Sequence, residues 1–237
     1  VEMKIVAVRI GDKYGPEYEK YLESKLPEYE FIWVREPIND KIQLQWNKMY
    51  GMNLNIDEPI VVMDIDVVLV NDYKKLFDYP INKGQFLAIP GWWRDTSGKK
   101  HKINGGFFKY YPKDCKYIYD RFMQQPIYWQ KYYISKGIAK GPVNGEQYFV
   151  EDSVRERLEL ITVPESWVTR WCAKEDIGVK NFDLVEWKTK IQRQYYEVTG
   201  NDYIYMGGEF HPDIKMVHFT HSTNKPHDWE DIDIFYE

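Results

Sequence analysis

The chain has 237 residues, of which 43% are hydrophobic and 29% charged, and its formal net charge is -5. This length and composition predict a globular protein that needs no disulfide or structural metal to be stable. Proteins that bind nucleic acid usually carry a basic excess, so the negative charge argues against such a partner. No stretch reaches the roughly 18 apolar residues of a membrane-spanning helix, and we expect no transmembrane segment.

Cysteine usage points to a reducing compartment. The chain has two cysteines, Cys115 and Cys172, and their spacing matches neither a zinc site nor a redox motif. The first residues lack the pattern of a signal peptide. We therefore expect a cytoplasmic protein.

Short β-branched runs alternate with segments of helical spacing along the first half of the chain. The apolar runs predict strands at 4–10, 30–34, 59–63, 85–89, 106–110 and 216–219. Helical spacing predicts helices at 18–26, 40–52, 113–125 and 147–157. This alternation favours an α/β fold with helices flanking a sheet. Without an internal repeat or a linker, we expect a single domain over residues 1–237.

Two aspartates stand within an otherwise apolar stretch. Asp64 and Asp66 flank Ile65 directly after the predicted strand 59–63. In extended backbone both side chains point the same way, and two convergent carboxylates suit Mg²⁺ or Mn²⁺. A strand this apolar is typical of a parallel sheet, where ligands bind at the carboxyl ends of strands. The alternative is an exposed loop that happens to carry two acids.

Several blocks of the chain resemble glycosyltransferase family 8, which includes glycogenin and bacterial lipopolysaccharide galactosyltransferases. Segment 62–71, continuing to Leu76-Phe77, resembles the Asp-x-Asp block of that family. The other similar blocks, in the same order as in the family, are 5–14 (the first strand and uridine-binding turn), 103–112 (Phe-Asn-Ser-Gly-Val), 145–147 (Gly-Asp-Gln), and 217–219 with 225–226 (His-Phe…Lys-Pro-Trp). The resemblance implies a GT-A fold, which is Rossmann-like with a mixed, mainly parallel sheet flanked by helices.

The resemblance also implies roles for individual residues. The implied metal ligands are Asp64, Asp66 and His218. The implied donor-binding residues are Val8, Arg9, Ile10, Tyr14, Lys48, Asp64, Ile65, Asp66 and Lys225, with Tyr14 stacking on the base and Lys225 binding the diphosphate. The implied catalytic residues, which would touch the donor sugar or the acceptor, are Asn104, Glu146 and Gln147.

Some positions depart from the family pattern or keep a second interpretation. The spacing from His218 to Lys225 is one residue longer than usual, which makes His221 a rival ligand. Glu146 replaces the aspartate of the family; it is either a helix N-terminal acid or a base for the acceptor hydroxyl, so retention and inversion both stay open. Two further segments keep two interpretations. Either they have no part in binding, or they contact the acceptor; they are Trp92-Trp93-Arg94 and the basic run from Lys99 to Lys102.

Together these patterns predict a hexosyltransferase that depends on Mn²⁺ or Mg²⁺. It would move a sugar from a nucleoside-diphosphate donor, such as UDP-glucose, to a hydroxyl of a glycan or glycoprotein. One alternative, a sugar nucleotidyltransferase, would be expected to carry a basic, glycine-rich loop after the first strand, which 9–15 lacks. The other, a carbohydrate-binding module, explains the 17% aromatic content but needs no paired carboxylates. A viral branch resembling the chlorovirus glycosyltransferases would place the protein in the host cytoplasm.

Overall fold

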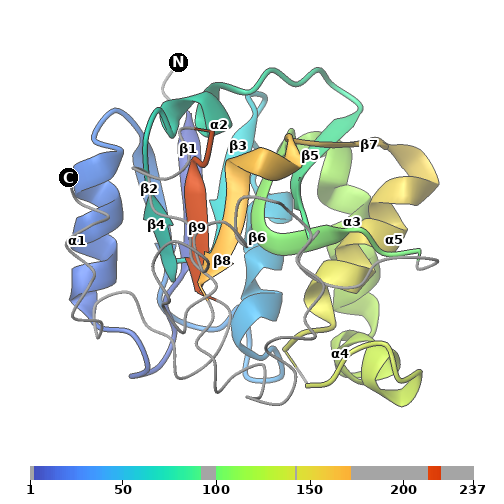
Figure 1. The fold of residues 1–237 in the computed structure, drawn as a ribbon. Helices are drawn as coiled ribbons and strands as arrows, with labels where there is room; N and C mark the ends of the chain where they lie inside the picture. The colour runs from blue at the N-terminus through green and yellow to red at the C-terminus, as the bar shows by residue number, and fades with distance from the viewer. Residues whose placement is uncertain (1–2, 92–99, 142, 172–212, 220–237) are drawn as a thin grey trace, which may run out of the picture. The chain divides into compact units, whose positions relative to one another are not determined.

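The computed structural model describes residues 3–91, 100–141, 143–171 and 213–219 (Figure 1). The chain divides into two compact units, each with its own sheet. The first unit comprises Val1–Ile65, Pro80–Ile89 and Gly98–Thr162. The second comprises Asp66–Tyr79, Pro90–Ser97 and Val163–Glu237. The single domain expected from the sequence stays a prediction.

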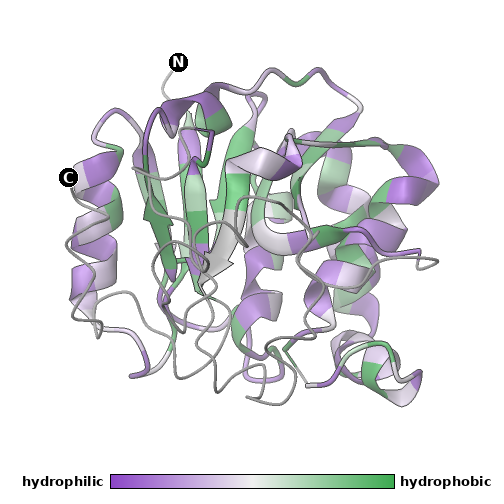
Figure 2. Cartoon of the chain, viewed as in Figure 1, coloured by the Kyte–Doolittle hydropathy of each residue, from purple (hydrophilic) through white to green (hydrophobic). Residues whose placement is uncertain are grey.

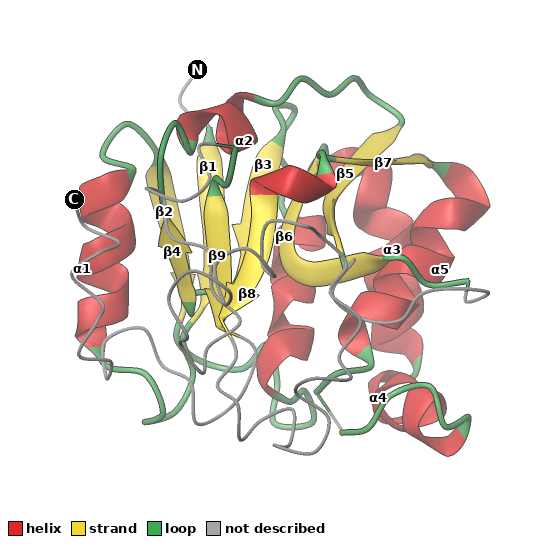
Figure 3. Ribbon diagram, viewed as in Figure 1, coloured by secondary structure: helices red, strands yellow, loops and turns green. Residues whose placement is uncertain are grey.

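The first unit is built on a six-stranded sheet (Figure 3). Its strands, in spatial order, are β2 (Glu30–Val34), β1 (Lys4–Val8), β3 (Ile60–Met63), β6 (Ile103–Tyr110), β5 (Gln85–Pro90) and β7 (Glu159–Thr162). Strand β1 runs parallel to β2 and β3, and β5 runs parallel to β7. Strand β6 is antiparallel to β3. The predicted mixed, mainly parallel sheet is confirmed.

Strand β3 positions the first aspartate. All four of its residues are buried, as expected for a strand with a neighbour on each side. Met63 pairs with Ala7 of β1 and with Phe107 of β6. The backbone amide of Asp64 donates to the carbonyl oxygen of Gly106 at 2.9 Å, so the pairing with β6 continues for one more residue. Asp64 therefore lies at the carboxyl end of β3.

The helices of the first unit agree with the predictions only in part. They are α1 (Pro16–Lys25), the 3₁₀ helix η1 (Leu44–Asn53), α3 (Pro112–Gln124), α4 (Pro126–Ser135) and α5 (Glu146–Arg157). The helix expected over 40–52 is present over Leu44–Asn53, but as a 3₁₀ helix: its buried Trp46, Met49 and Met52 recur every three residues, the period of that helix. Helix α4 was not predicted. Pro126 ends the preceding helix but also begins a new one, a position that suits proline.

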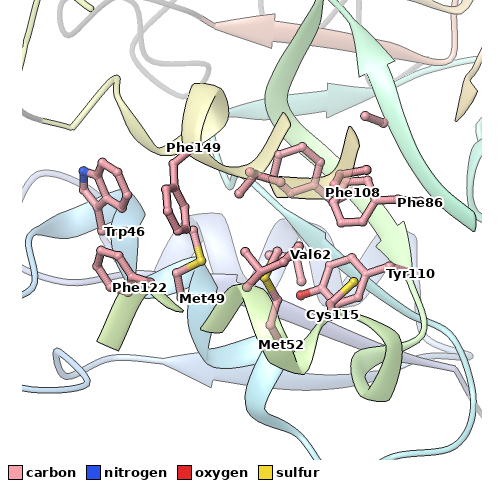
Figure 4. Packing of buried hydrophobic residues seen from close by; sticks show 14 of the residues in the cluster. Trp46, Met49, Met52, Val62, Phe86, Phe108, Tyr110, Cys115, Phe122 and Phe149 are labelled. Atoms are coloured by element: carbon pink, nitrogen blue, oxygen red, sulfur yellow. The ribbon is translucent and has the colours of Figure 1, made fainter. Parts of the chain in front are cut away.

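One hydrophobic core of the first unit lies between the sheet and the helices η1, α3 and α5 (Figure 4). Trp46 of η1 stacks on Phe122 of α3 with ring centroids 5.1 Å apart, and Phe86 stacks in the same way on Tyr110. Figure 2 shows β3 as hydrophobic, whereas α1, α3 and α5 also carry hydrophilic residues. Burying one large side chain of this kind contributes roughly 1.5–3 kcal/mol. This packing holds η1 and α5, which carry candidate site residues, against the sheet.

The second unit contains a three-stranded sheet in the order β4 (Val67–Leu69), β9 (Met216–Phe219), β8 (Val168–Trp171). Strand β9 is antiparallel to β4 and parallel to β8, and all four of its residues are buried. The late strand predicted at 216–219 is confirmed. The sequence did not predict β4 or β8, nor the short helices α2 (Lys74–Asp78) and η2 (Glu165–Trp167).

Candidate functional site

A buried lysine holds the first aspartate in place. Lys48 lies in η1, and its side chain is 4% exposed. Its ammonium donates to Oδ1 of Asp64 at 2.9 Å and to the carbonyl oxygen of Gly105 at 2.7 Å. Oε2 of Glu146 lies 3.3 Å from the same ammonium. An ammonium has three donors, so these three protein oxygens account for all of them. Lys48 therefore contacts Asp64 directly, at a place where the sequence predicted a contact with the donor.

The charges of this cluster shift one another's pKa values. Burial disfavours the charged form of Lys48, but the carboxylates of Asp64 and Glu146 outweigh it and raise the pKa of Lys48. Burial raises the pKa of Glu146 to about 7, against the opposing effect of Lys48. Oε1 of Glu146 is buried and has no hydrogen-bond partner among the described residues. Glu146 is thus a carboxyl group that can exchange a proton near neutral pH.

The first residues of β6 are held by side chains from α5 and from β6 itself. Oε1 of Gln147 accepts a hydrogen bond from the amide of Gly105 at 3.0 Å, and Oδ1 of Asn104 accepts one from the amide of Gly106 at 2.8 Å. A Cβ atom on Gly105 would lie 2.9 Å from Oε2 of Glu146. Only glycine therefore fits at position 105 without displacing the carboxylate. Both Asn104 and Gln147 bind backbone here, whereas the resemblance implied that they touch the donor sugar or the acceptor.

The second unit brings a histidine to the second aspartate. His218 of β9 pairs with Val67 of β4 in the sheet, and Asp66 directly precedes that strand. The amide of Phe219 donates to the carbonyl oxygen of Asp66 at 2.9 Å. Nε2 of His218 lies 3.7 Å from Oδ1 of Asp66, and both side chains are largely buried. Between His218 and His221, which the sequence left open, only His218 lies within the described residues.

The donor atoms of these side chains fit a divalent cation. Only Ile65 separates Asp64 from Asp66 along the chain, so Asp64, Asp66 and His218 form one group of potential ligands. The 3.7 Å between Asp66 and His218 is longer than a hydrogen bond, yet both atoms can contact one ion that lies about 2.1 Å from each. Two carboxylates and an imidazole suit Mn²⁺ or Mg²⁺.

The loop after β1 is tied down by an ion cluster that the sequence did not predict. Glu19 of α1 is 8% exposed; Arg9 donates to its carboxylate, as does Arg35 at 2.7 and 3.0 Å. A second nitrogen of Arg9 lies 3.4 Å from the carbonyl oxygen of Tyr14. The half-buried ring of Tyr14 packs edge-on against Tyr18 at 4.8 Å. The sequence held one indication of this cluster: Glu19 is an acidic residue between Tyr18 and Tyr21, on the buried side of α1.

The other residues predicted for the site lie partly within the described residues. Val8, Arg9 and Ile10 are half-buried at the carboxyl end of β1, where a nucleotide was expected. The residues singled out in the sequence that lie outside the described residues are Lys225, His221, Trp92, Trp93, Arg94, Lys99 and Cys172. Within the part of the chain that is described, no helix combines the length and the apolar character needed to cross a membrane.

Comparison with known proteins rests on structure alone. No family model and no curated protein matches the chain. The glycosyltransferase GlyE from Streptococcus pneumoniae TIGR4 aligns over 99% of the chain, with a TM-score of 0.57 and 11% identity. The galactosyltransferase LgtC, solved with donor and acceptor sugar analogs, aligns over 99% with a TM-score of 0.53 and 12% identity. The fold is the GT-A glycosyltransferase fold.

The extent of the match differs between these structures. The chain covers 94% of LgtC but only 59% of GlyE, so it spans less than two thirds of the GlyE chain. It covers 49% of the bifunctional glycosyltransferase WbbM, with a TM-score of 0.52 and 12% identity. The predicted fold, and its likeness to a galactosyltransferase, are confirmed at the level of structure.

Proposed function

We propose that this chain is a metal-dependent glycosyltransferase. It would transfer a sugar from a nucleoside-diphosphate donor, with UDP-glucose the first candidate, to a hydroxyl group of a glycan or glycoprotein. The observation that carries the proposal is the Asp64-Ile65-Asp66 segment at the carboxyl end of β3, with Lys48 on Asp64 and His218 beside Asp66. In an α/β sheet this end of the strands is where ligands bind.

The metal site has a defined task in this proposal. Asp64, Asp66 and His218 would hold Mn²⁺ or Mg²⁺, and the bound cation would neutralise charge on the departing diphosphate. Lys48 keeps Asp64 in position, because the two side chains form an ion pair at a buried ammonium and breaking such a pair is costly. Lys225 remains our proposed second cation for the diphosphate.

The residues near Gly105 of β6 would receive the donor sugar. Asn104 and Gln147 fix the backbone of this part of the strand, and the missing side chain at Gly105 lets a ligand approach closely. Oε1 of Glu146 is a buried oxygen that a sugar hydroxyl can satisfy. In the transfer, the bond from the anomeric carbon to the diphosphate oxygen breaks and a bond to the acceptor oxygen forms. The acceptor proton leaves with a base, for which Glu146 is our candidate.

One test is donor hydrolysis without an acceptor. The chain would be incubated with UDP-glucose and Mn²⁺, and released UDP would be measured by a coupled assay. We expect release that requires the metal and falls at least about 100-fold in Asp64→Asn. Asp57→Asn is the matched control, because Asp57 is an exposed aspartate paired with Lys113 far along the chain. A carbohydrate-binding module would release no UDP.

The nucleotidyltransferase alternative is separated by its own reaction. Such an enzyme would form UDP-glucose and pyrophosphate from UTP and glucose 1-phosphate. In the loop after β1, Arg9 is engaged by Glu19 and Tyr14. Release of pyrophosphate from UTP, without release of UDP from UDP-glucose, would favour this alternative over the glycosyltransferase.

A further inference from the structure

A second cluster of polar and aromatic side chains joins α5 to α4 and to the residues that precede β6. Nε2 of His101 lies 2.9 Å from Oδ1 of Asp152, and the ammonium of Lys100 lies 2.6 Å from the same oxygen. The hydroxyl of Tyr133 donates to Oδ2 of Asp152 at 2.8 Å. The ring of Tyr148 packs edge-on against His101 with centroids 4.9 Å apart. None of these residues has a role in the proposed metal or donor site.

Helix α5 places this cluster close to the start of β6. Gln147 and Glu151, one helical turn apart, both accept hydrogen bonds from the backbone at the start of β6, at Gly105 and at Lys102 and Ile103. Tyr148 and Asp152 form the neighbouring stripe of the same helix and contact His101. His101 is four residues from Gly105, so their Cα atoms are at most about 14 Å apart.

The cluster keeps unused hydrogen-bonding capacity that is open to solvent. A carboxylate offers about four acceptor positions, and three partners contact that of Asp152, which leaves one on Oδ2. Asp152 is 24% exposed and Lys100 is 64% exposed, and the ammonium of Lys100 has two further donors. The cluster therefore offers donors and an acceptor together, next to a half-buried aromatic ring.

This combination suits a neutral sugar better than an ion. A phosphate would meet the carboxylate of Asp152, and a divalent cation would meet the ammonium of Lys100 on the same oxygen. Sugar hydroxyls donate and accept at once, and the apolar face of a pyranose packs on an aromatic ring. We propose that Lys100, His101, Tyr148 and Asp152 form a subsite for a neutral pyranose, the acceptor sugar. The acceptor role rests on the proposed function; the binding of sugar does not.

The test is amide NMR of the ¹⁵N-labelled protein without nucleotide or metal. The probes are the methyl glycosides of glucose, galactose, mannose and xylose at millimolar concentration, with inorganic phosphate as the contrasting ligand. We expect at least one glycoside, and not phosphate, to shift the amides of 100–103 and 147–152. In Asp152→Asn the dissociation constant should rise at least tenfold. Glu156→Gln, on the same helix and in an exposed pair with Arg121, should bind as the wild type does.

Two outcomes would overturn the subsite: no glycoside shifts these amides, or Asp152→Asn binds as tightly as the wild type. If Asp152→Asn does not fold, His101→Gln serves instead, and its affinity should fall while its spectrum stays that of a folded protein.

Titration of UDP and Mn²⁺ into the same variants separates the two proposals. Loss of sugar binding with unchanged UDP binding supports the subsite, and absence of UDP binding in the wild type counts against the glycosyltransferase alone.

Discussion

The ammonium of Lys48 lies 2.9 Å from Oδ1 of Asp64, in an environment where the lysine is 4% exposed. The same ammonium contacts Glu146, so one buried cation joins the candidate metal ligand to the candidate base. A buried charge that loses its partner is costly, and the geometry of all three side chains is therefore coupled. The carboxylate of Asp64 is held in its orientation before any ligand binds.

Replacing this lysine should destabilise the protein. Lys48→Met keeps most of the side-chain volume but leaves Asp64 and Glu146 without their cation. We expect the free energy of unfolding to fall by about 3 kcal/mol, measured by urea denaturation at pH 7. Lys116→Met is the control, since it removes an exposed pair with Asp120 and should change the same quantity by less than about 0.5 kcal/mol. Equal effects of the two substitutions would contradict the account.

The buried carboxyl of Glu146 should make stability depend on pH. Its pKa is raised to about 7, so the folded state binds this proton more tightly than the unfolded state does. The stabilisation is complete below pH 4.5 and is lost as the pH rises toward 7. Across this window the wild type should lose about 2–3 kcal/mol relative to Glu146→Gln. Urea denaturation of both proteins at pH 5 and pH 8 measures it, and a constant difference would argue against a buried, titrating Glu146.

A methyl group at position 105 should disturb the cluster. In Gly105→Ala the new Cβ would lie 2.9 Å from Oε2 of Glu146 and 3.2 Å from Cβ of Gln147. We expect thermal denaturation to show a loss of about 1–3 kcal/mol, together with a loss of UDP-glucose hydrolysis. Gly141→Ala is the matched control, because its new Cβ would meet only Nδ2 of Asn144 at an ordinary 3.5 Å. Normal stability and hydrolysis in Gly105→Ala would mean that the cluster tolerates displacement.

The sequence was most informative where a charged residue stood within a pattern of apolar residues. Asp64 and Asp66 stand out because carboxylates are rare in an apolar strand, and the order of the similar blocks suggested the GT-A fold that the structure has. The same reasoning suggested His218, which by itself is only a histidine on a buried strand. Short blocks and their order along the chain were therefore sufficient for the fold, while the roles of Asp64, Asp66 and His218 stay predictions.

Contacts between distant residues could not be predicted in this way. Lys48 meets Asp64 across 16 positions and Gly105 across 57, and no local pattern specifies such pairings. The sequence therefore assigned Lys48 to the donor, while the structure places its ammonium on three protein oxygens. Helix α4 was missed for a different reason: it begins at Pro126, directly after the predicted helix 113–125, where a proline usually marks the end of a helix.

The ion cluster behind the loop after β1 should affect nucleotide binding. Glu19→Gln removes the charge that holds Arg9 and Arg35, and Arg9 contacts the carbonyl oxygen of Tyr14. Because a looser loop must be ordered when the nucleotide binds, we expect the Kd for UDP to rise about tenfold by calorimetry. Glu23→Gln, on the same helix and bonded to Trp33, should leave the Kd unchanged. An unchanged Kd in Glu19→Gln would remove this loop from the binding site.

The central claim is a metal site for a nucleoside diphosphate at Asp64, Asp66 and His218. The most direct measurement is calorimetric titration of UDP, with and without Mn²⁺, into the wild type and Asp66→Ala. The account predicts that Mn²⁺ tightens UDP binding in the wild type and that the substitution abolishes this effect. Binding of UDP that is equally tight without metal, or equally tight in Asp66→Ala, would contradict it.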